Sequence, residues 1–584
     1  EITYGDWSSD VCSSDLTLTN GITDLATPPN SFAVAEWTYT YDPNAAFAGK
    51  VVINEIMFNP LGGSPTNEWI ELRNISTNLI NLTGWQFTRG VNYTFPNVAI
   101  PAGGHLVVAA SVAAFQARYP GVTNVVGGWT GSLGNSGESI DLETSLGEKV
   151  NSIRYAKEGD WGRRERGSGV SLVGSLTRSG TTVTVTMFGH GYTANDQVVI
   201  SGADQPEYNG RYVVGGVTAS TFTYTIAGSP ATPATGTIIC RQVIDDTFSG
   251  WTWFNAADGF GSSLELVNPA LPNDGGQNWT TSAAPGGTPG ALNGANTNNV
   301  APLITEVLHT PPVPRSTDPV TISARVRDEL PSGVFSVSLF YRTHTVASPG
   351  AFSSVPMLDN GASGDGAAGD GVFGAVLAPM TNNALVEFYV EAVDAEGYSR
   401  TWPAPAMEPA DVGTNSLGQV ANALFQVDNS SQQTNAAPLY KLILTAAEQT
   451  ELGNLFSGAP NSDAEMNGTF LSLDATGVEC RYLAGTRNRG HGSRSGTPHN
   501  YRINLASDQP WKGVKGFNMN ARTVPSQVIG AAVAQRAGAA GNNSRFAFLR
   551  VNNGAGPGGT PPNGLYAANE EDRKSTRLNS SHRT

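Results

Sequence analysis

The chain has 584 residues, with 34 Lys and Arg against 49 Asp and Glu, and a formal net charge of −15. This mild acidity argues against nucleic acid as a partner, because proteins that bind it present concentrated basic faces. No apolar run approaches the length that spans a bilayer, so we expect no membrane segment. Short alternating apolar runs between Gly, Pro, Asn and Asp predict many strands and turns, arranged in several domains.

The two ends of the chain are related through their coding DNA. Asp6–Leu16 can be encoded by bases whose reverse complement, read in a shifted frame, gives Asp572–Ser581. Both segments resemble a translated short-read sequencing adapter. We therefore expect 1–16 and 571–584 to be adapter-derived artefacts that lie outside fold reasoning. The rest is then an interior piece of a longer protein, whose signal peptide and anchor were never read.

The first module with a clear pattern begins at Val51, after 17–50, which we expect to hold the end of an Ig-like module and a linker. Four segments, Val52–Pro60, Glu68–Asn74, Leu82–Trp85 and Ile100–Val108, resemble the lamin-tail domain in its bacterial form. The resemblance implies a compact Ig-like sandwich. Large apolar residues along these segments independently predict such a fold. We assign 51–168 to the first part of this domain.

The lamin-tail pattern breaks off after Trp161 and resumes near Trp251. Between these points, Thr alternates with Val in Thr181–Met187, and the segment resembles small β modules of fibre-like and surface proteins. We predict that 169–241 is a β module inserted into a surface loop, where insertions are tolerated. Residues 242–293 are then the last part of the lamin-tail domain.

Residues 300–427 are expected to form an Ig-like or fibronectin-like module. The runs Val320–Val326, Val337–Tyr341 and Val386–Ala392 alternate apolar and polar residues, as half-buried strands do. The polar stretch 428–437 is expected to link this module to the next.

One loop of the Ig-like module carries three carboxylates among glycines: Asp359, Asp365 and Asp370. Carboxylates so close in sequence can bind Ca²⁺. Asp also occurs in turns because it bonds its own backbone and tolerates left-handed conformations. The sequence leaves both interpretations open, with the turn as the simpler one.

The pattern changes character at 438–570. Thr445 and Glu448 have the spacing of a capping box, which predicts the start of a helix. The segments Arg487–Ser493, Tyr501–Leu505 and Gly513–Asn520 are similar in order and spacing to the start of the spore-coat protein H (CotH) kinase family. The resemblance implies a truncated α+β kinase-like region.

That resemblance also implies a site. An intact CotH-type kinase would use ATP and Mg²⁺, with its catalytic residues expected beyond Glu570. The candidate phosphate-binding or nucleotide-binding residues are Arg487, Arg489, Arg494, Arg502 and Glu570. The family usually places a lysine before the Tyr501 strand, where this chain has Pro, His and Asn, so pairing of these arginines with local carboxylates or solvent stays open.

A truncated domain should leave part of its core uncovered. We therefore expect the apolar faces of Tyr501–Leu505 and Phe546–Phe548 to be exposed. The fold class expected for the whole is mostly all-β: tandem lamin-tail and Ig-like sandwiches with an inserted small β module, then the truncated α+β CotH kinase-like region.

Two functions fit these expectations. In the first, the chain is a fragment of an exported bacterial surface protein, located at the cell surface or outside the cell. Its modules act as binding or spacer units for other surface or extracellular proteins or for polysaccharide. In the second, the intact parent is an atypical secreted protein kinase that phosphorylates Ser-rich surface proteins. No cofactor other than ATP, Mg²⁺ or Ca²⁺ is suggested.

Overall fold

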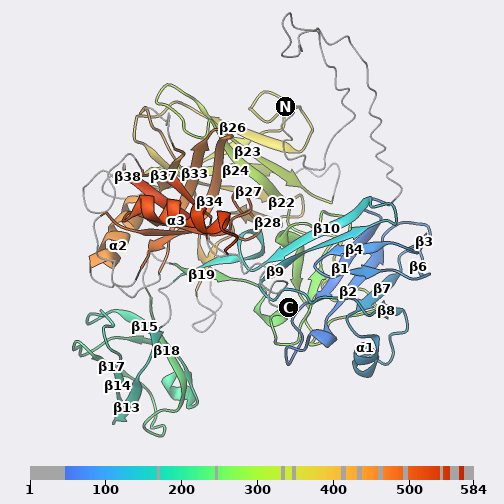
Figure 1. The fold of residues 1–584 in the computed structure, drawn as a ribbon, viewed down its shortest axis with the longest axis horizontal. Coiled ribbons are helices and arrows are strands. Elements are labelled where there is room, and N and C mark those ends of the chain that lie inside the picture. The colour runs from blue at the N-terminus through green and yellow to red at the C-terminus, as the bar shows by residue number, and fades with distance from the viewer. Residues whose placement is uncertain are drawn as a thin grey trace, which may run out of the picture.

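The computed structural model describes residues 47–166, 171–243, 248–329, 336–344, 350–408, 416–430, 437–457, 464–490, 498–539, 543–552 and 564–570. Strands dominate these residues, which confirms the mostly all-β fold class (Figure 1). Within these ranges, no helix is long and apolar enough to cross a membrane. Both expected adapter segments, 1–16 and 571–584, and nearly all of 17–50 lie outside the described residues.

The first sandwich packs a six-stranded sheet, β21-β20-β1-β2-β7-β8, against a four-stranded sheet, β10-β9-β4-β5. Ile70 and Leu72 on β2 face the core between the sheets, together with Phe87 of β4. Trp69 points to the other side and packs on Phe115 of the short helix α1. Its elements are β1 (Val51–Met57), η1 (Pro65–Asn67), β2 (Trp69–Asn74), β3 (Ile80–Asn81), β4 (Gln86–Arg89), β5 (Tyr93–Thr94), β6 (Ala99–Ile100), β7 (His105–Ala109), α1 (Val112–Arg118), β8 (Val125–Gly127), β9 (Gly137–Glu143), β10 (Lys149–Ala156), η4 (Asn255–Ala257), β20 (Leu264–Leu266), η5 (Gly276–Asn278) and β21 (Trp279–Thr281).

Two strands of that sheet come from much later in the chain. β20 pairs antiparallel with β1, with Glu265 opposite Glu55, and β21 pairs with β20. Residues on both sides of the 171–243 segment therefore build one core.

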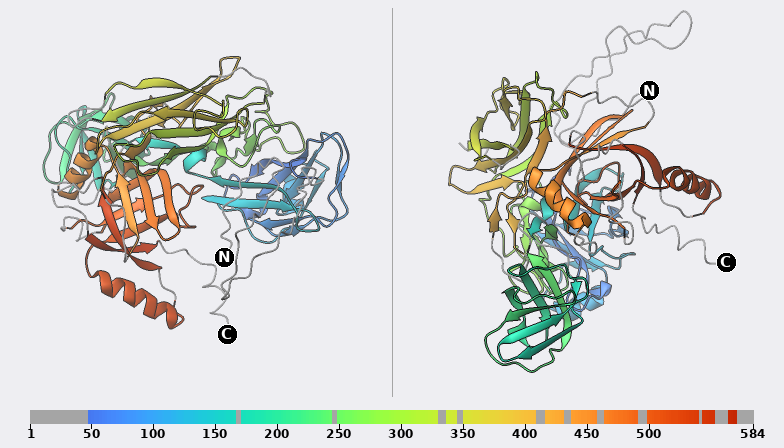
Figure 2. Two further views of the ribbon diagram at one scale, coloured as in Figure 1. Left: turned by 90° about the horizontal axis from the view of Figure 1, so that it is seen from above. Right: turned by 90° about the vertical axis from the view of Figure 1, so that its left-hand side faces the viewer.

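Residues 171–243 form a separate β unit with its own core, which projects from the rest of the molecule (Figures 1 and 2). Sheet β13-β14-β17 lies against sheet β12-β18-β15-β16, and Leu176, Val198 and Phe222 are fully buried between them. The elements are β12 (Ser171–Leu172), β13 (Ser175–Ser179), β14 (Thr182–Thr186), β15 (Gln197–Ala203), η3 (Pro206–Tyr208), β16 (Gly210–Val213), β17 (Thr221–Thr225) and β18 (Gly236–Val243).

The Ig-like part is a second sandwich. Sheet β22-β23-β26 faces sheet β25-β24-β27-β28, and β31 pairs with β27. On β23, Val320, Ile322, Ala324 and Val326 are buried and alternate with less buried residues, as a half-buried strand requires. The strands are β22 (Leu303–Thr310), β23 (Val320–Arg327), β24 (Ser336–His344), β25 (Ser353–Met357), β26 (Val372–Leu377), β27 (Leu385–Val393), β28 (Ser399–Trp402) and β31 (Ala423–Gln426).

The C-terminal region is a closed barrel of strand order β32-β33-β34-β35-β36-β38-β37, with a parallel β32–β37 pair completing the ring. The capping box is confirmed: the Thr445 amide donates to Glu448 Oε2 (2.9 Å), and the Glu448 amide donates to Thr445 Oγ1 (3.2 Å). The elements are β32 (Leu439–Ile443), α2 (Ala446–Ser457), β33 (Met466–Asp474), β34 (Gly477–Asn488), β35 (Tyr501–Asn504), β36 (Gly516–Asn520), α3 (Val524–Arg536), β37 (Ser544–Val551) and β38 (Gly564–Glu570).

Barrel closure overturns one expectation. Tyr501, Ile503 and Leu505, which we expected to be uncovered, are buried among the aromatic residues of the barrel interior. Phe546 lies on the outside, half-buried against Val528 of α3. The prediction of an open core was wrong because the ring closes through β37 and β38, so the strands present are sufficient to cover these faces.

A small mixed sheet joins the modules. β11 (Arg163–Arg166), which follows η2 (Gly159–Trp161), pairs antiparallel with β19 (Phe248–Thr252) and parallel with β29 (Ala406–Met407), which in turn pairs with β30 (Ser416–Gly418). We call β19-β11-β29-β30 the junction sheet. Phe248 also exchanges backbone hydrogen bonds of 2.9 and 2.8 Å with Glu465, just before β33 of the barrel. The first sandwich, the Ig-like sandwich and the barrel are thereby hydrogen-bonded to one another.

Candidate functional site

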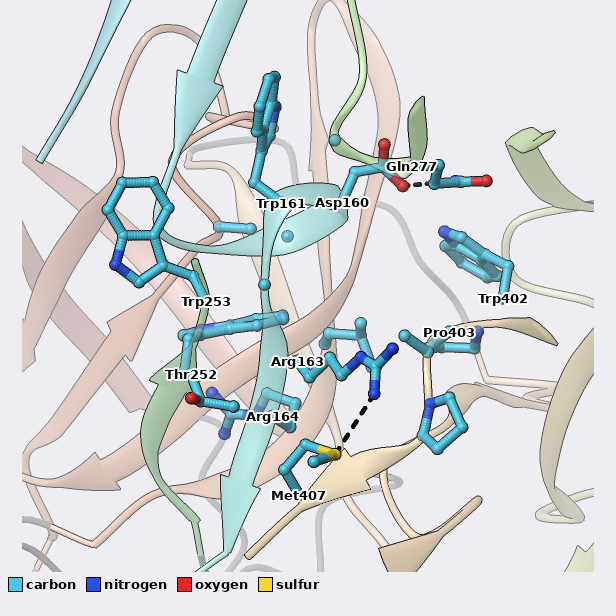
Figure 3. Close-up of a pocket in the computed structure, with 18 of the residues that line it drawn as sticks. Asp160, Trp161, Arg163, Arg164, Thr252, Trp253, Gln277, Trp402, Pro403 and Met407 are labelled. Atoms are coloured by element: carbon cyan, nitrogen blue, oxygen red, sulfur yellow. Dashed lines mark hydrogen bonds between the residues drawn. The ribbon is translucent and has the colours of Figure 1, made fainter. Parts of the chain in front are cut away.

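A cleft of about 670 Å³ lies where the first sandwich, the junction sheet, the Ig-like sandwich and the barrel meet (Figure 3). We call it the junction cleft. Its volume is within the range of roughly 300–1,000 Å³ that is usual for ligand pockets.

Aromatic rings form much of the wall of the junction cleft. Trp161 and Trp279 are buried with ring centroids 5.8 Å apart, and they belong to the core of the first sandwich. Trp251, Trp253 and Trp402 are only half-buried. In the view of Figure 3, Trp253 and Trp402 lie on opposite sides of the Arg163 side chain. Core packing therefore accounts for the first two rings, whereas the other three retain accessible surface.

A network of polar groups forms the back of the cleft. Gln277 donates to Asp160 Oδ1 (2.5 Å) and accepts from the Ile304 amide (2.8 Å), which ties the first sandwich to the Ig-like sandwich. Arg400 of β28 donates to the carbonyls of Pro302 (2.9 Å) and Gln277 (3.0 Å). These contacts fix the groups along the wall, so the cleft is preorganised.

Arg164 is the most buried charge of the cleft wall, with a side chain only 2% exposed. Its Nη1 contacts Glu465 Oε2 at 3.1 Å, and its guanidinium lies over the rings of Phe248 (4.8 Å) and Trp251 (5.1 Å). In the described part of the chain, its Nε and Nη2 meet no hydrogen-bond acceptor. Both atoms are also closed to solvent, so Arg164 is held in place by Glu465 and by the two rings that its guanidinium covers.

Asp160 of the cleft wall is one of three carboxylates between the first sandwich and the barrel, with Glu158 and Asp508. The Asp160 amide donates to Asp508 Oδ2 (2.7 Å), and the Ser507 amide donates to Glu158 Oε2 (3.0 Å). Burial raises the pKa of Glu158 and of Asp160, and it raises the pKa of Asp508 to about 7. This interface therefore holds one carboxyl group, that of Asp508, that changes charge near neutral pH, beside two others whose pKa burial raises.

The structure brings three of the sequence-predicted arginines together on the barrel. Arg487 of β34 and Arg502 of β35 are cross-strand partners. Arg489 follows β34 and donates to Asn520 Oδ1 at 2.7 Å. Burial lowers the pKa of Arg489, and the neighbouring charges of Arg502 and Arg487 lower it further. Like charges gathered in this way are a suitable arrangement for an anion.

Of the other two candidates, one lies apart from this group and the other is not described. Glu570, at the end of β38, forms an ion pair with Arg545 and accepts from Asn543 Nδ2 at 2.8 Å. Arg494 lies outside the described residues.

The three aspartates of the acidic loop bond to the backbone around them. Asp365 accepts from the amides of Asn360, Gly361 and Ser363, and Asp359 accepts from those of Gly369 and Gly371. Asp370 accepts from the amides of Ala367 and Val372. Across the described ranges, no three His, Cys, Asp or Glu side chains gather in a way that could hold a metal. The geometry therefore favours the turn interpretation, and Ca²⁺ binding stays a prediction.

Sequence reasoning missed the junction cleft. Its tryptophans come from segments far apart in the chain, and each segment alone looks like part of a sandwich core. The sequence signal that could have indicated it is the close spacing of Trp251, on β19, and Trp253, just after that strand.

Comparisons with known proteins identify one module. Residues 44–157 match the family model of the Lamin Tail Domain. A comparison with curated proteins found no match. Among solved structures, the phage phi92 endosialidase is similar at 10% identity and a TM-score of 0.14, covering 90% of this chain and 70% of that one. A trypsin-activated alpha-2-macroglobulin from Escherichia coli is similar at 9% identity and a TM-score of 0.16, covering 80% and 30%. Both TM-scores are too low to assign a fold.

Proposed function

We propose that the chain is part of an exported bacterial surface protein whose lamin-tail and Ig-like modules form a binding scaffold and present a CotH-like domain. The observation that supports this proposal is the junction sheet, in which three modules share backbone hydrogen bonds.

A protein that acts only as a spacer can have flexible links between its modules. With such links, the modules usually move relative to one another. Here the links are strand pairs and buried ion pairs. Lys441 at the start of the barrel, for example, contacts Asp428 at the end of the Ig-like sandwich at 2.5 Å, with both side chains almost fully buried. A cleft whose walls come from several modules can keep one shape only when the modules are fixed in this way. The arrangement therefore favours binding over spacing.

Export is tested by surface labelling. Antibodies raised against the projecting unit 171–243 are applied to intact and to permeabilised cells that produce the protein. We expect intact cells to be labelled as strongly as permeabilised ones. Labelling that requires permeabilisation would contradict a surface location.

A second function is proposed for the intact parent: an atypical secreted protein kinase that uses ATP and Mg²⁺ on Ser-rich surface proteins. The observation in its favour is the cluster of Arg487, Arg489 and Arg502, because phosphoryl transfer requires cations that hold phosphate groups. Phosphoryl transfer also needs carboxylates that position Mg²⁺, which the resemblance implies lie beyond Glu570.

The kinase proposal predicts different behaviour for the fragment and its parent. With labelled ATP, Mg²⁺ and a Ser-rich acceptor, we expect no incorporation by residues 17–570 and clear incorporation by the parent. Arg489→Ala should abolish incorporation by the parent, and the exposed Arg522→Ala serves as the matched control. A parent that incorporates no label would contradict the kinase proposal, and label in the fragment would place the catalytic carboxylates inside it.

A further inference from the structure

The junction cleft combines two features that its architectural role does not require. Trp251, Trp253 and Trp402 are only half-buried. Arg163 is exposed at the cleft, where its Nη1 lies 3.4 Å from Met407 Sδ (Figure 3). Apolar faces beside a few fixed polar groups are the usual composition of a ligand site.

The positive and negative charges of the cleft are close to balanced, which limits the chemical class of ligand that the cleft can bind. Arg164 faces Glu465, and the charge of Arg400 acts on Asp160. A polyanion such as a nucleic acid requires a large excess of basic groups, whereas the lining holds Arg163, Arg164 and Arg400 against Asp160 and Glu408, and Arg164 is paired with Glu465. The ligand is therefore expected to be polar and not highly charged.

A sugar ring has the complementary chemistry. Its axial C–H groups form an apolar face that packs on an indole, and its hydroxyls lie around the rim. Each hydroxyl both donates and accepts, so one ring can accept from Arg163 and donate to Asp160. Trp251 belongs to β19 of the junction sheet, and Trp402 belongs to β28 of the Ig-like sandwich. A chain of sugar rings can lie between these two indoles.

A proline-rich peptide is the main alternative, because aromatic grooves also bind such peptides. Proline has no N–H donor, so a peptide of this kind would donate few hydrogen bonds to the carboxylate of Asp160. The mixture of donors and acceptors in the wall favours the saccharide.

We propose that the junction cleft binds an oligosaccharide chain, with its sugar rings stacked on Trp251 and Trp402 and its hydroxyls bonded to Arg163 and Asp160. This inference rests on the proposed binding scaffold and adds the class of its ligand.

The test is an array of neutral and uronic-acid oligosaccharides probed with fluorescently labelled chain 17–570, followed by titration of the saccharides that bind. We expect at least one class of saccharide to bind. Trp251→Ala and Trp402→Ala should each lower the affinity by about tenfold or more, as loss of an aromatic anchor typically does. Phe260→Ala removes an aromatic ring that is 74% exposed outside the cleft, and should leave the affinity unchanged.

Arg163→Ala provides a second variant that an effect on folding would not explain, because the residue is exposed. It should weaken binding with an unchanged circular dichroism spectrum. Binding of no saccharide, equal binding by the tryptophan variants, or binding of a synthetic proline-rich peptide alone would overturn the proposal. If intact cells are still labelled by the antibody in that case, the surface location stands and only the ligand class fails.

Discussion

The hydroxyl of Thr288 lies between two buried carboxylates, 3.2 Å from Glu55 Oε2 and 3.0 Å from Glu265 Oε1. A hydroxyl has one proton and can donate it to only one of them, so the other contact is completed when one carboxyl group is protonated. Burial raises the pKa of Glu55 to about 8, and the nearby charge of Glu71 contributes. Burial also raises the pKa of Glu71 to about 7. The protonation of Glu55 and Glu71 in the first sandwich is therefore sensitive to pH in this range.

These glutamates hold the segment that closes the first sandwich. The Thr288 amide donates to Glu55 (2.9 Å), and the Gly290 amide donates to Glu71 (2.5 Å). A raised pKa means that the folded state binds the proton more tightly than the unfolded state. The stabilisation is therefore fully present below about pH 4.5 and is lost as the pH rises through 7 to 8.

We predict that hydrogen exchange of residues 284–296, corrected for the intrinsic rate at each pH, becomes faster between pH 5 and pH 8.5. The loss of protection should be at least about 2 kcal/mol, because each unit of pKa difference corresponds to about 1.4 kcal/mol and both pKa values are raised by more than one unit. In Glu55→Gln, which keeps the shape but cannot ionise, the pH dependence should be much smaller. Corrected protection that is the same at both pH values would show that the carboxyls ionise without affecting this segment.

At the scale of secondary-structure elements, β11 has the central position, because its two edges pair with strands from different modules. On one face, Arg164 reaches Glu465, whose carboxylate also accepts from Asn504 of β35. Glu465 lies directly over Gly485 of β34, where a Cβ atom would be 2.0 Å from Glu465 Oε2. The absence of a side chain at Gly485 is therefore necessary for this contact.

We predict that Glu465→Ala destabilises the junction by about 3–5 kcal/mol, because it leaves the charge of Arg164 buried without a partner. The matched control is Glu306→Ala, which removes a carboxylate from an ion pair with Arg325 in which Glu306 is 48% exposed. Loss of such a surface pair should cost no more than about 1 kcal/mol. Thermal melting of both variants measures the difference, and equal small shifts would mean that Arg164 finds another partner.

The unit 171–243 is an element-scale insertion whose ends are close together. Arg166 and Phe248, on either side of it, are cross-strand partners in the junction sheet. We therefore predict that replacing residues 169–241 with a short Gly/Ser bridge leaves the melting of the remaining chain within a few degrees of its original temperature. The ion pair between Arg211 and Glu408 is half-exposed and contributes little, whereas the pair between Arg241 and Glu165 (2.7 Å) is largely buried, and its loss should account for most of the few degrees. Loss of cooperative melting would show that the unit shares a core with the first sandwich.

For the whole molecule, local patterns predicted local structure well. The alternation on β23 and the capping box at Thr445 depend on residues close in sequence, and both are present. The lamin-tail resemblance is supported by the family match over 44–157. The domain boundaries and the CotH resemblance stay predictions.

Contacts between modules could not be predicted from local sequence patterns. The pairing of Glu165 with Met407, or of Phe248 with Glu465, joins short segments that carry no periodic signal of their own. Closure of the barrel was missed for a similar reason, since a parallel pair between β32 and β37 leaves no local turn in the sequence. The arginine candidates came from a motif and could be named in advance, whereas the junction cleft exists only through the assembled modules.

The central claim is that the first sandwich and the barrel are held in one fixed arrangement. The most direct measurement is the distance between fluorophores at Thr77→Cys in the first sandwich and Ser526→Cys on α3, both at exposed positions, in chains in which Cys480 is replaced by Ser. Single-molecule energy transfer should give one narrow distance distribution, which broadens when Glu465→Ala is added. A broad or multiple distribution in the chain without Glu465→Ala would contradict the account, because it would mean that the modules move as separate units.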